Sequence, residues 1–199
     1  MSPHGPCNPP RANNTAIAVL VLIVVGLILL AIMGVLAAVL FPAFLRARVA
    51  ATEDSCMMNL KRLGGAMRAY QANWNDACPS ADTWNDSLAP GFRDRAVFRC
   101  PADKSGKPGY AMNRKLSGAS RSVLNAGSDT VMLFDSVPGY NQAGGPELLP
   151  TEPRHPGGHM VVFADGHVQK VVLSAGQSLN WTPAKAEATA PERPRRKAY

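Results

Sequence analysis

The longest uninterrupted apolar run in the chain extends from Ala16 to Phe41, where every residue is apolar or glycine. Coiled as a helix at about 1.5 Å per residue, this run would be roughly 39 Å long, which exceeds the ~30 Å hydrocarbon core of a bilayer. The core of a cleaved signal peptide is only about 7–15 residues long, so a cleaved signal is the weaker interpretation. The pattern therefore predicts a transmembrane helix over residues 16–41.

Beyond Phe41 the apolar pattern changes from continuous to periodic. Pro42 follows directly, and we expect it to bend the helix rather than to end it. Apolar residues then recur at intervals of three, four and once seven positions, which is typical of one face of an amphipathic helix. This apolar stripe consists of Leu45, Val49, Cys56, Leu60, Leu63, Met67, Tyr70 and Trp74. We predict one long helix that is membrane-embedded in its first half and amphipathic in its continuation, residues 43–75.

Short apolar segments separated by Pro- and Gly-rich loops follow the helix. The predicted strands are Val97–Cys100, Thr130–Phe134, Met160–Ala164 and His167–Leu173. Asp165-Gly166, between the last two, is a strong signal for a two-residue hairpin turn. Asp129 and Asp135 bracket the second strand and are expected at its solvent-facing ends. The predicted fold class is α+β, a long N-terminal helix packed on a small antiparallel sheet.

Composition divides the chain into four parts. Residues 1–15 are rich in Pro and Asn and are predicted to be disordered, residues 16–41 form the membrane helix, and residues 42–180 form a globular domain. Residues 181–199 are predicted to be a disordered basic tail. Although the net charge is +7, the stretch 42–180 holds fifteen basic and twelve acidic residues, so no basic face indicates nucleic-acid binding.

Several motifs resemble one protein family. The stretch Ala37–Gln71 resembles the N-terminal helix of type IV pilin-like proteins, the pseudopilin relatives abundant in planctomycete-type bacteria. FRCPAD (Phe98–Asp103) and YAMN (Tyr110–Asn113) are similar to that family's middle motifs. His155, followed by nine residues and then Asp165-Gly166, resembles its prepilin-associated H-x9-D-G element. The resemblance covers about residues 20–173 and implies a pilin-like fold.

The prepilin cleavage motif is degenerate in this chain. A prepilin carries Gly before its cleavage site, then usually Phe, and a Glu five residues into the mature chain. Leu20, Val21 and Val25 stand at those positions here. We therefore expect that a prepilin peptidase does not cut the chain, and that the contact which the Glu makes with a neighbouring N-terminus is absent.

Topology is predicted from the resemblance rather than from charge. Arg11 precedes the apolar run, whereas Arg46 and Arg48 follow it. The positive-inside rule alone would place the C-terminal domain in the cytoplasm, but this rule weakens for long translocated domains. The family places its domain outside, so we expect a single-pass inner-membrane protein with a periplasmic or extracytoplasmic C-terminal domain.

The cysteines suggest a disulfide. Cys7 precedes the apolar run, and Cys56, Cys78 and Cys100 follow it without any CxxC pair, which argues against a zinc site or a thioredoxin-like motif. Two of these three could pair on an oxidising side of the membrane. Cys56 lies on the apolar stripe, Cys100 follows a strand expected to pack on that stripe, and both lie in stretches that resemble the family. We predict a Cys56–Cys100 disulfide, with Cys78 as the leftover thiol or the competing partner.

A histidine-rich stretch near the C-terminus has two interpretations. It contains the candidate ligands of a zinc-like ion, His155, His159, Asp165 and His167. In the structural interpretation, Pro156–Gly158 makes one turn, Asp165-Gly166 makes the hairpin, and His155 forms a hydrogen bond to that second turn. We favour the structural interpretation, because Asp165 and His167 flank a tight turn while His159 precedes a strand, so these side chains need not converge. The resemblance supports the same choice, since the family's signature is associated with pilin processing systems rather than with an activity.

The predicted function is therefore non-enzymatic and requires no cofactor. We expect a structural or accessory component of a type IV pilus-like or type II secretion-like system. Its partners would be membrane lipid and other pilin-like subunits or secretion-system proteins, not nucleic acid. Small residues would permit close helix packing in the bilayer, namely Gly26, Gly34, Ala37 and Ala38. The alternative is a membrane-anchored metal-dependent enzyme that uses the histidine-rich hairpin.

Overall fold

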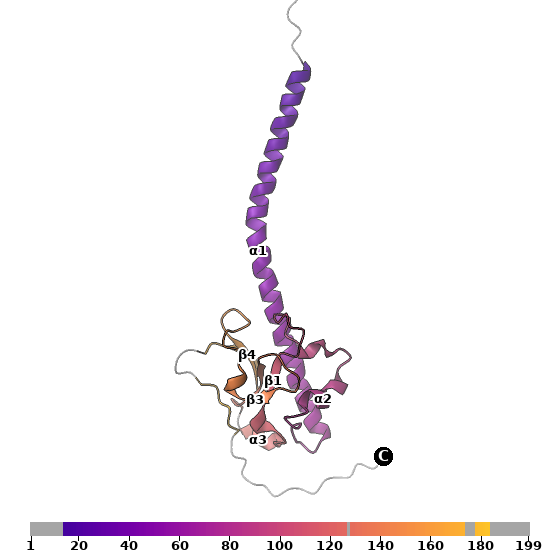
Figure 1. Ribbon diagram of the computed structural model, residues 1–199, viewed down its shortest axis with the longest axis vertical. Coiled ribbons are helices and arrows are strands. Elements are labelled where there is room, and N and C mark those ends of the chain that lie inside the picture. Colours follow the sequence, from indigo (N-terminus) through magenta and orange to yellow (C-terminus); the bar gives the residue numbers. More distant parts are fainter. Residues whose placement is uncertain (1–13, 127, 174–177, 184–199) are drawn as a thin grey trace, which may run out of the picture. The chain divides into compact units, whose positions relative to one another are not determined.

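The computed structural model describes residues 14–126, 128–173 and 178–183 (Figure 1). The chain divides into two compact units, Met1–Arg48 and Val49–Tyr199. The predictions for residues 1–13 and for the basic tail from residue 184 onward concern residues outside those that the structure describes.

The first unit consists, in its described part, of the beginning of helix α1. This helix runs from Asn14 to Asn73 and contains Pro42, which therefore does not end it, as predicted. Asn14 and Thr15 already belong to the helix, so the predicted N-terminal segment is two residues too long. The apolar side chains of this unit are exposed, for example Leu30 with 74% of its surface accessible. By length and composition α1 could span a membrane.

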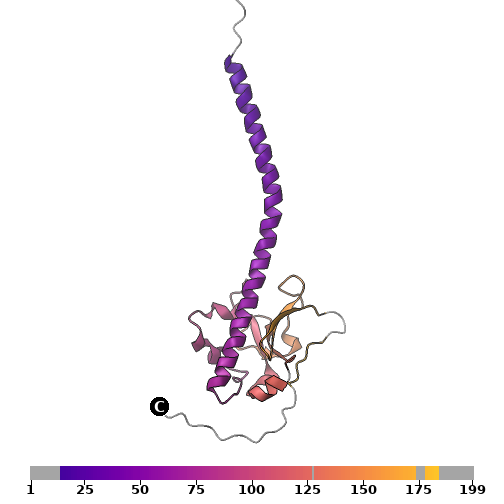
Figure 2. The same cartoon turned by 180° about the vertical axis from the view of Figure 1, so that it is seen from behind.

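In the second unit the last turns of α1 pack against a sheet (Figure 2). Cys56, Leu60, Leu63 and Met67 are fully buried, which confirms the predicted apolar stripe over this part of the helix. The stripe is wrong at its ends, where the exposed side chains are Leu45, Val49 and Trp74. Helical periodicity alone therefore extended the predicted stripe too far in both directions.

The sheet has five strands in the order β3-β1-β2-β4-β5. Their bounds are Tyr110–Asn113 (β1), Val131–Asp135 (β2), Ala143–Gly144 (β3), His159–Phe163 (β4) and Val168–Val171 (β5). All neighbouring pairs are antiparallel except β1 and β3, which are parallel. The prediction of an antiparallel sheet is therefore corrected to a mixed sheet. The loop after β2 passes to the far side of β1, and the Met112 N–H donates to the Gln142 carbonyl at 3.0 Å.

Every residue of β1, β2 and β4 is buried, because both faces of the sheet are covered. The α1 stripe covers one face, where the gap is narrow enough that a Cβ on Gly64 would lie 3.0 Å from Val162 Cγ1. On the other face Phe134 packs edge-to-face against Trp181, with ring centroids 4.8 Å apart. Trp181 therefore belongs to the folded unit, and the predicted tail begins too early.

Short helices replace one predicted strand. The segment predicted as strand Val97–Cys100 contains the end of the 3-10 helix η2, Arg95–Phe98, which begins where Asp94 Oδ1 accepts a hydrogen bond from the Ala96 N–H at 2.8 Å. Its apolar side chains face the core without strand pairing. The other short helices are α2 (Trp84–Leu88), η1 (Ala89–Gly91), η3 (Arg114–Leu116), α3 (Arg121–Ala126) and η4 (Pro146–Leu148).

The predicted hairpin joins β4 to β5, but its loop has three residues, not two. The Gly166 N–H donates to the Phe163 carbonyl at 2.8 Å, and the Phe163 N–H donates to the His167 carbonyl at 3.0 Å. Gly166 has φ +84°, the left-handed conformation that closes a type I turn with a bulge. The extra loop residue is Ala164, which the sequence pattern had assigned to the strand.

Candidate functional site

Four buried side chains from distant parts of the sequence meet where strand β2 ends. We call Cys56, Cys100, Asp135 and His155 the Cys–His–Asp cluster. Cys56 and Cys100 form the predicted disulfide, with their Cα atoms 5.3 Å apart, which confirms that prediction. His155 Nε2 lies 3.3 Å from Cys100 Sγ and 3.7 Å from Asp135 Oδ2. None of the four residues is more than 2% exposed.

Each member is positioned by a different element. Cys56 lies on the buried stripe of α1, Cys100 follows η2, and Asp135 is the last residue of β2. His155 begins a tight turn in which Pro156 is followed by Gly157 at φ +82°, the signature of a type II turn. The Gly158 N–H closes this turn by donating to the His155 carbonyl at 3.2 Å. The turn confirms the loop predicted at Pro156–Gly158.

Arg154 fixes the same loop from the preceding position. Its guanidinium donates to the Gly109 carbonyl at 2.9 Å and to the Ser136 carbonyl, which follows β2. It also faces the Asp103 carboxylate at 3.8 Å, with both side chains mostly buried. These contacts fix the His155 loop against the residues that flank β1 and β2, which restricts the position of the imidazole. No local pattern in the sequence indicates this role of Arg154.

Asp135 is buried, which corrects the prediction of a solvent-facing strand end. Its Oδ2 accepts a hydrogen bond from the Met160 N–H at 3.1 Å, while Oδ1 has no hydrogen-bond partner among the described residues. Burial raises the pKa of Asp135 to about 6, partly offset by the Met160 hydrogen bond and by Arg154. Burial also lowers the pKa of His155 below its ordinary value. Both shifts favour the uncharged forms, so we describe this contact as a polar one rather than an ion pair.

The Asp135→Asn variant should show a changed pH dependence of the free energy of unfolding. Because burial raises the pKa of Asp135 to about 6 in the folded state, its stabilising contribution is full below about pH 4 and is lost as the pH rises through about 6. Asn cannot ionise. We therefore expect the unfolding free energy of the variant, relative to the wild type, to increase by about 3 kcal/mol between pH 4 and pH 7.

Urea unfolding of both proteins at several pH values in this range measures the effect. His155 Nε2 lies 3.7 Å from Asp135 Oδ2, so the difference between the two proteins reports on this polar contact as a whole. Asp54→Asn, at an exposed position of α1, controls for the loss of one negative charge. Parallel pH profiles for the wild type and Asp135→Asn would show that the buried carboxyl group does not resist ionisation.

The histidine-rich stretch does not form one site in the described structure. His155 belongs to the Cys–His–Asp cluster, and His159 is the first residue of β4, where its buried Nδ1 has no described partner. Asp165 and His167 are about half exposed at the hairpin, 2.5 Å apart through Oδ1 and Nδ1. Among the described residues, the donor group that does converge is Cys56, Cys100 and His155, within 4.8 Å of one another.

The predicted hydrogen bond from His155 to the hairpin turn is also wrong. The His155 ring instead contacts Cys100 and Asp135. The hairpin satisfies its own polar groups, since Asp165 Oδ1 accepts a hydrogen bond from the His167 N–H at 2.9 Å. His167 also stacks on Phe163, with ring centroids 4.4 Å apart. The two ends of the H-x9-D-G element are therefore joined through β4 and not through the imidazole.

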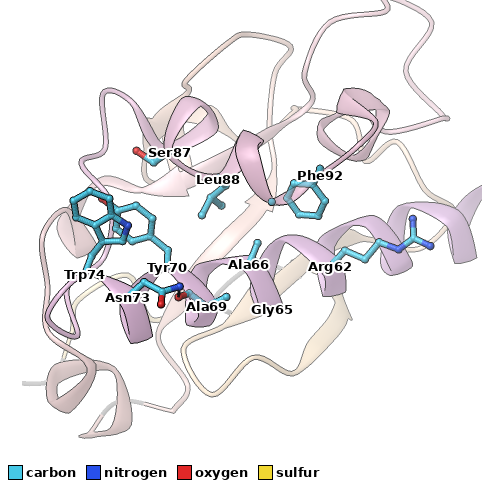
Figure 3. Close-up of a pocket in the computed structure, with 11 residues that line it drawn as sticks. Arg62, Gly65, Ala66, Ala69, Tyr70, Asn73, Trp74, Ser87, Leu88 and Phe92 are labelled. Carbon is cyan, nitrogen blue, oxygen red and sulfur yellow. Dashed lines mark hydrogen bonds between the residues drawn. The ribbon is translucent and has the colours of Figure 1, made fainter. Parts of the chain in front are cut away.

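An open groove of about 410 Å³ lies between the end of α1 and the segment α2–η1. Tyr70 and Trp74 stack at one end of the groove with ring centroids 5.6 Å apart, and Phe92 and Arg62 lie at the other end (Figure 3). Its lining residues include no carboxylate, histidine or cysteine. The groove therefore offers apolar and aromatic surface rather than groups for acid–base chemistry.

The small residues predicted to mediate helix packing are all exposed on α1. A Cβ added at Gly26 or Gly34 would meet nothing within 4 Å, and the neighbouring Ala37 and Ala38 are equally accessible. This surface has room for a second helix, and its use in lateral packing stays a prediction. Comparisons of the chain with protein-family models, with curated proteins and with solved structures gave no match.

Proposed function

We propose that this protein is a membrane-anchored, pilin-like structural subunit of a type IV pilus-like or type II secretion-like system. The observation that carries the proposal is a change in the surface of α1 along its length. Its first part presents apolar side chains on all sides, whereas the turns from Cys56 to Met67 bury one apolar face in a folded α+β unit. An apolar surface around a whole helix is stable in lipid, and a one-sided stripe is stable on a sheet.

The disulfide supports an extracytoplasmic position for the folded unit. Cys56–Cys100 links α1 to the segment after η2, and disulfides persist mainly in oxidising compartments such as the periplasm. The resemblance of the helix and of the H-x9-D-G element to pilin-like proteins supports the same orientation. Lipid surrounds the first part of α1 in this proposal, and neighbouring helices of like subunits pack along Gly26 and Gly34.

The full-length chain should remain in the membrane pellet after an alkaline carbonate wash, and intact-mass measurement should show that it retains its N-terminus. Placing two arginines at Leu29 and Leu30 should release the protein, because each charge near a bilayer centre costs about 2.5–3.5 kcal/mol. Met58→Arg is the matched control, at an exposed position of α1 in the folded unit. It should leave the protein in the pellet.

Protease added to spheroplasts tests the orientation, because an extracytoplasmic domain is digested without lysis. Recovery of the wild-type chain in the wash supernatant would contradict the membrane anchor. A mature chain that begins near Val21 would show instead that the degenerate motif is processed. Protection of the domain until lysis would place it in the cytoplasm.

A further inference from the structure

We propose that the Cys–His–Asp cluster is a redox-gated binding site for a thiophilic divalent cation of the Zn²⁺ class. In the oxidised chain the two sulfur atoms are bonded to each other. In the reduced chain Cys56 Sγ, Cys100 Sγ, His155 Nε2 and one carboxylate oxygen of Asp135 coordinate the cation. This inference concerns only residues of the folded unit, and it does not depend on the proposed membrane role.

The donor atoms lie at separations close to those of a metal site. In a tetrahedral zinc site, bond lengths of about 2.3 Å to sulfur and 2.0–2.1 Å to nitrogen separate a sulfur from a nitrogen ligand by about 3.5 Å. His155 Nε2 is already 3.3 Å from Cys100 Sγ and 3.7 Å from Asp135 Oδ2. All three donor atoms of Cys56, Cys100 and His155 lie within 4.8 Å of one another. When their bond is reduced, the two sulfurs must separate to about 3.8 Å to occupy two corners of such a site.

The disulfide leaves its polar neighbours without strong hydrogen-bond partners. A disulfide sulfur is a weak polar partner for the buried imidazole, and Asp135 Oδ1 has no partner in the described part of the chain although Asp135 is only 1% exposed. Buried polar atoms without a partner are costly, so each such atom requires an explanation. A cation held by both sulfurs would give the imidazole lone pair and the carboxylate a strong common partner.

A positively charged side chain lies close enough to balance the charge of the occupied site. Two thiolates and one carboxylate around a divalent cation carry a net charge of about −1, which is unfavourable in a buried site unless a positive group lies nearby. The Arg154 guanidinium supplies that charge, because it interacts electrostatically with both Asp135 and His155. Its own position is fixed by the Gly109 and Ser136 carbonyls. Sequence spacing did not reveal this donor set, since the two cysteines are 44 residues apart and form no CxxC pair.

The chemistry of the switch requires an external reductant, either a dithiol or a trialkylphosphine. A dithiol transfers two electrons and two protons to the Cys56–Cys100 bond, which yields two thiols, and is itself converted into a disulfide. A trialkylphosphine supplies the two electrons and becomes a phosphine oxide, while one water molecule supplies the oxygen atom and the two protons. The cation then displaces one proton from each thiol, and these two protons are released to solvent. Reoxidation by a disulfide compound reverses both steps and expels the cation.

Cobalt binding to the full-length chain in detergent micelles tests the proposal. The chain is reduced with a trialkylphosphine, stripped with a chelator and titrated with Co²⁺ under anaerobic conditions. We expect one Co²⁺ per reduced chain, with thiolate-to-cobalt charge-transfer absorption and the intense visible bands of tetrahedral coordination. One equivalent of Zn²⁺ should bleach these bands, and the oxidised chain should bind neither ion.

Variants identify the ligands. His155→Ala and Asp135→Asn should each weaken Zn²⁺ binding by at least the roughly 10–100-fold that loss of a residue merely orienting a metal ligand costs. Cys78→Ala and His167→Ala are the matched controls, one a thiol and one an imidazole outside the cluster, and should bind Zn²⁺ like the wild type. Circular dichroism establishes that each variant is folded.

A second measurement uses only the wild-type chain, in case the ligand variants do not fold. Zn²⁺ should protect Cys56 and Cys100 of the reduced chain from a maleimide, as mapped by mass spectrometry, without changing the labelling of Cys78. The proposal is overturned if the reduced chain binds no metal. It is equally overturned if Zn²⁺ protects Cys78 as fully as it protects Cys56 and Cys100, or if the folded His155→Ala variant binds as tightly as the wild type.

Discussion

A chain in which Cys56 and Cys100 are both replaced by Ala should lose about 4 kcal/mol of unfolding free energy. The disulfide closes a loop across a sequence separation of 44 residues, and the chain-entropy argument gives this magnitude for the restriction that it imposes on the unfolded state. For a folded unit of this size, such a loss corresponds to a melting temperature lower by roughly 8–16 °C. Both sulfur atoms lie in the core, so the truncation also removes buried contacts.

Urea unfolding followed by tryptophan fluorescence measures this loss. Trp84 is fully buried and packs edge-to-face on Phe98, two residues before Cys100, so it reports on the segment that the disulfide anchors. Wild-type protein treated with a phosphine and a chelator should show a similar loss. Cys78→Ala is the control, since it removes a buried free thiol, should cost about 1 kcal/mol and should leave the response to the phosphine intact. An unchanged unfolding midpoint in the double variant would mean that the disulfide contributes nothing to stability.

The features that could be predicted from the sequence depend on neighbouring residues. Helical periodicity identified the buried stripe from Cys56 to Met67, because side chains three and four positions apart share one face of a helix. The Asp-Gly pair identified the β4–β5 hairpin, because its glycine adopts a positive φ. The disulfide prediction combined such a local signal with the family resemblance: Cys56 lies on the stripe, Cys100 follows an apolar segment that was expected to pack on it as a strand, and both lie in stretches that resemble the family.

The features that were missed depend on contacts across the fold. β1 has four residues, all of them buried, and β3 has only two, both partly exposed, so neither strand presents enough sequence for an alternating pattern. Asp135 follows four apolar residues without alternation, and this run was the one available signal that the strand is covered on both faces. His155 lies 55 residues from Cys100, so counting positions toward the nearby Asp165-Gly166 turn suggested the wrong partner. The predicted ligands His155, His159, Asp165 and His167 do not form one site for the same reason, because they were chosen by their closeness in sequence.

The His155 loop also shows where the H-x9-D-G stretch is least tolerant of change. Gly158 has φ +152° and precedes β4, which pairs with β5 through His159 and Val171. A Cβ at Gly158 would overlap the carbonyl oxygen of Val171 and lie 3.2 Å from the Val172 nitrogen. These obstacles are backbone atoms of the neighbouring segment, so no side-chain rotation relieves them. Any side chain here must displace β5 or the turn that carries His155.

Gly158→Ala should therefore destabilise the folded unit by about 2–6 kcal/mol, which adds the cost of a strained backbone conformation to that of overpacking. Gly157→Ala is the matched control in the same turn. Its φ of +82° is also unfavourable for Ala, but the added Cβ would meet nothing within 4 Å, so we expect a cost of only about 1–2 kcal/mol. Urea unfolding of the two variants measures the difference, and hydrogen exchange of the β4 and β5 amides should show faster exchange in Gly158→Ala alone. Equal losses in the two variants would mean that backbone conformation, not the approach of Val171, sets the requirement for glycine at this turn.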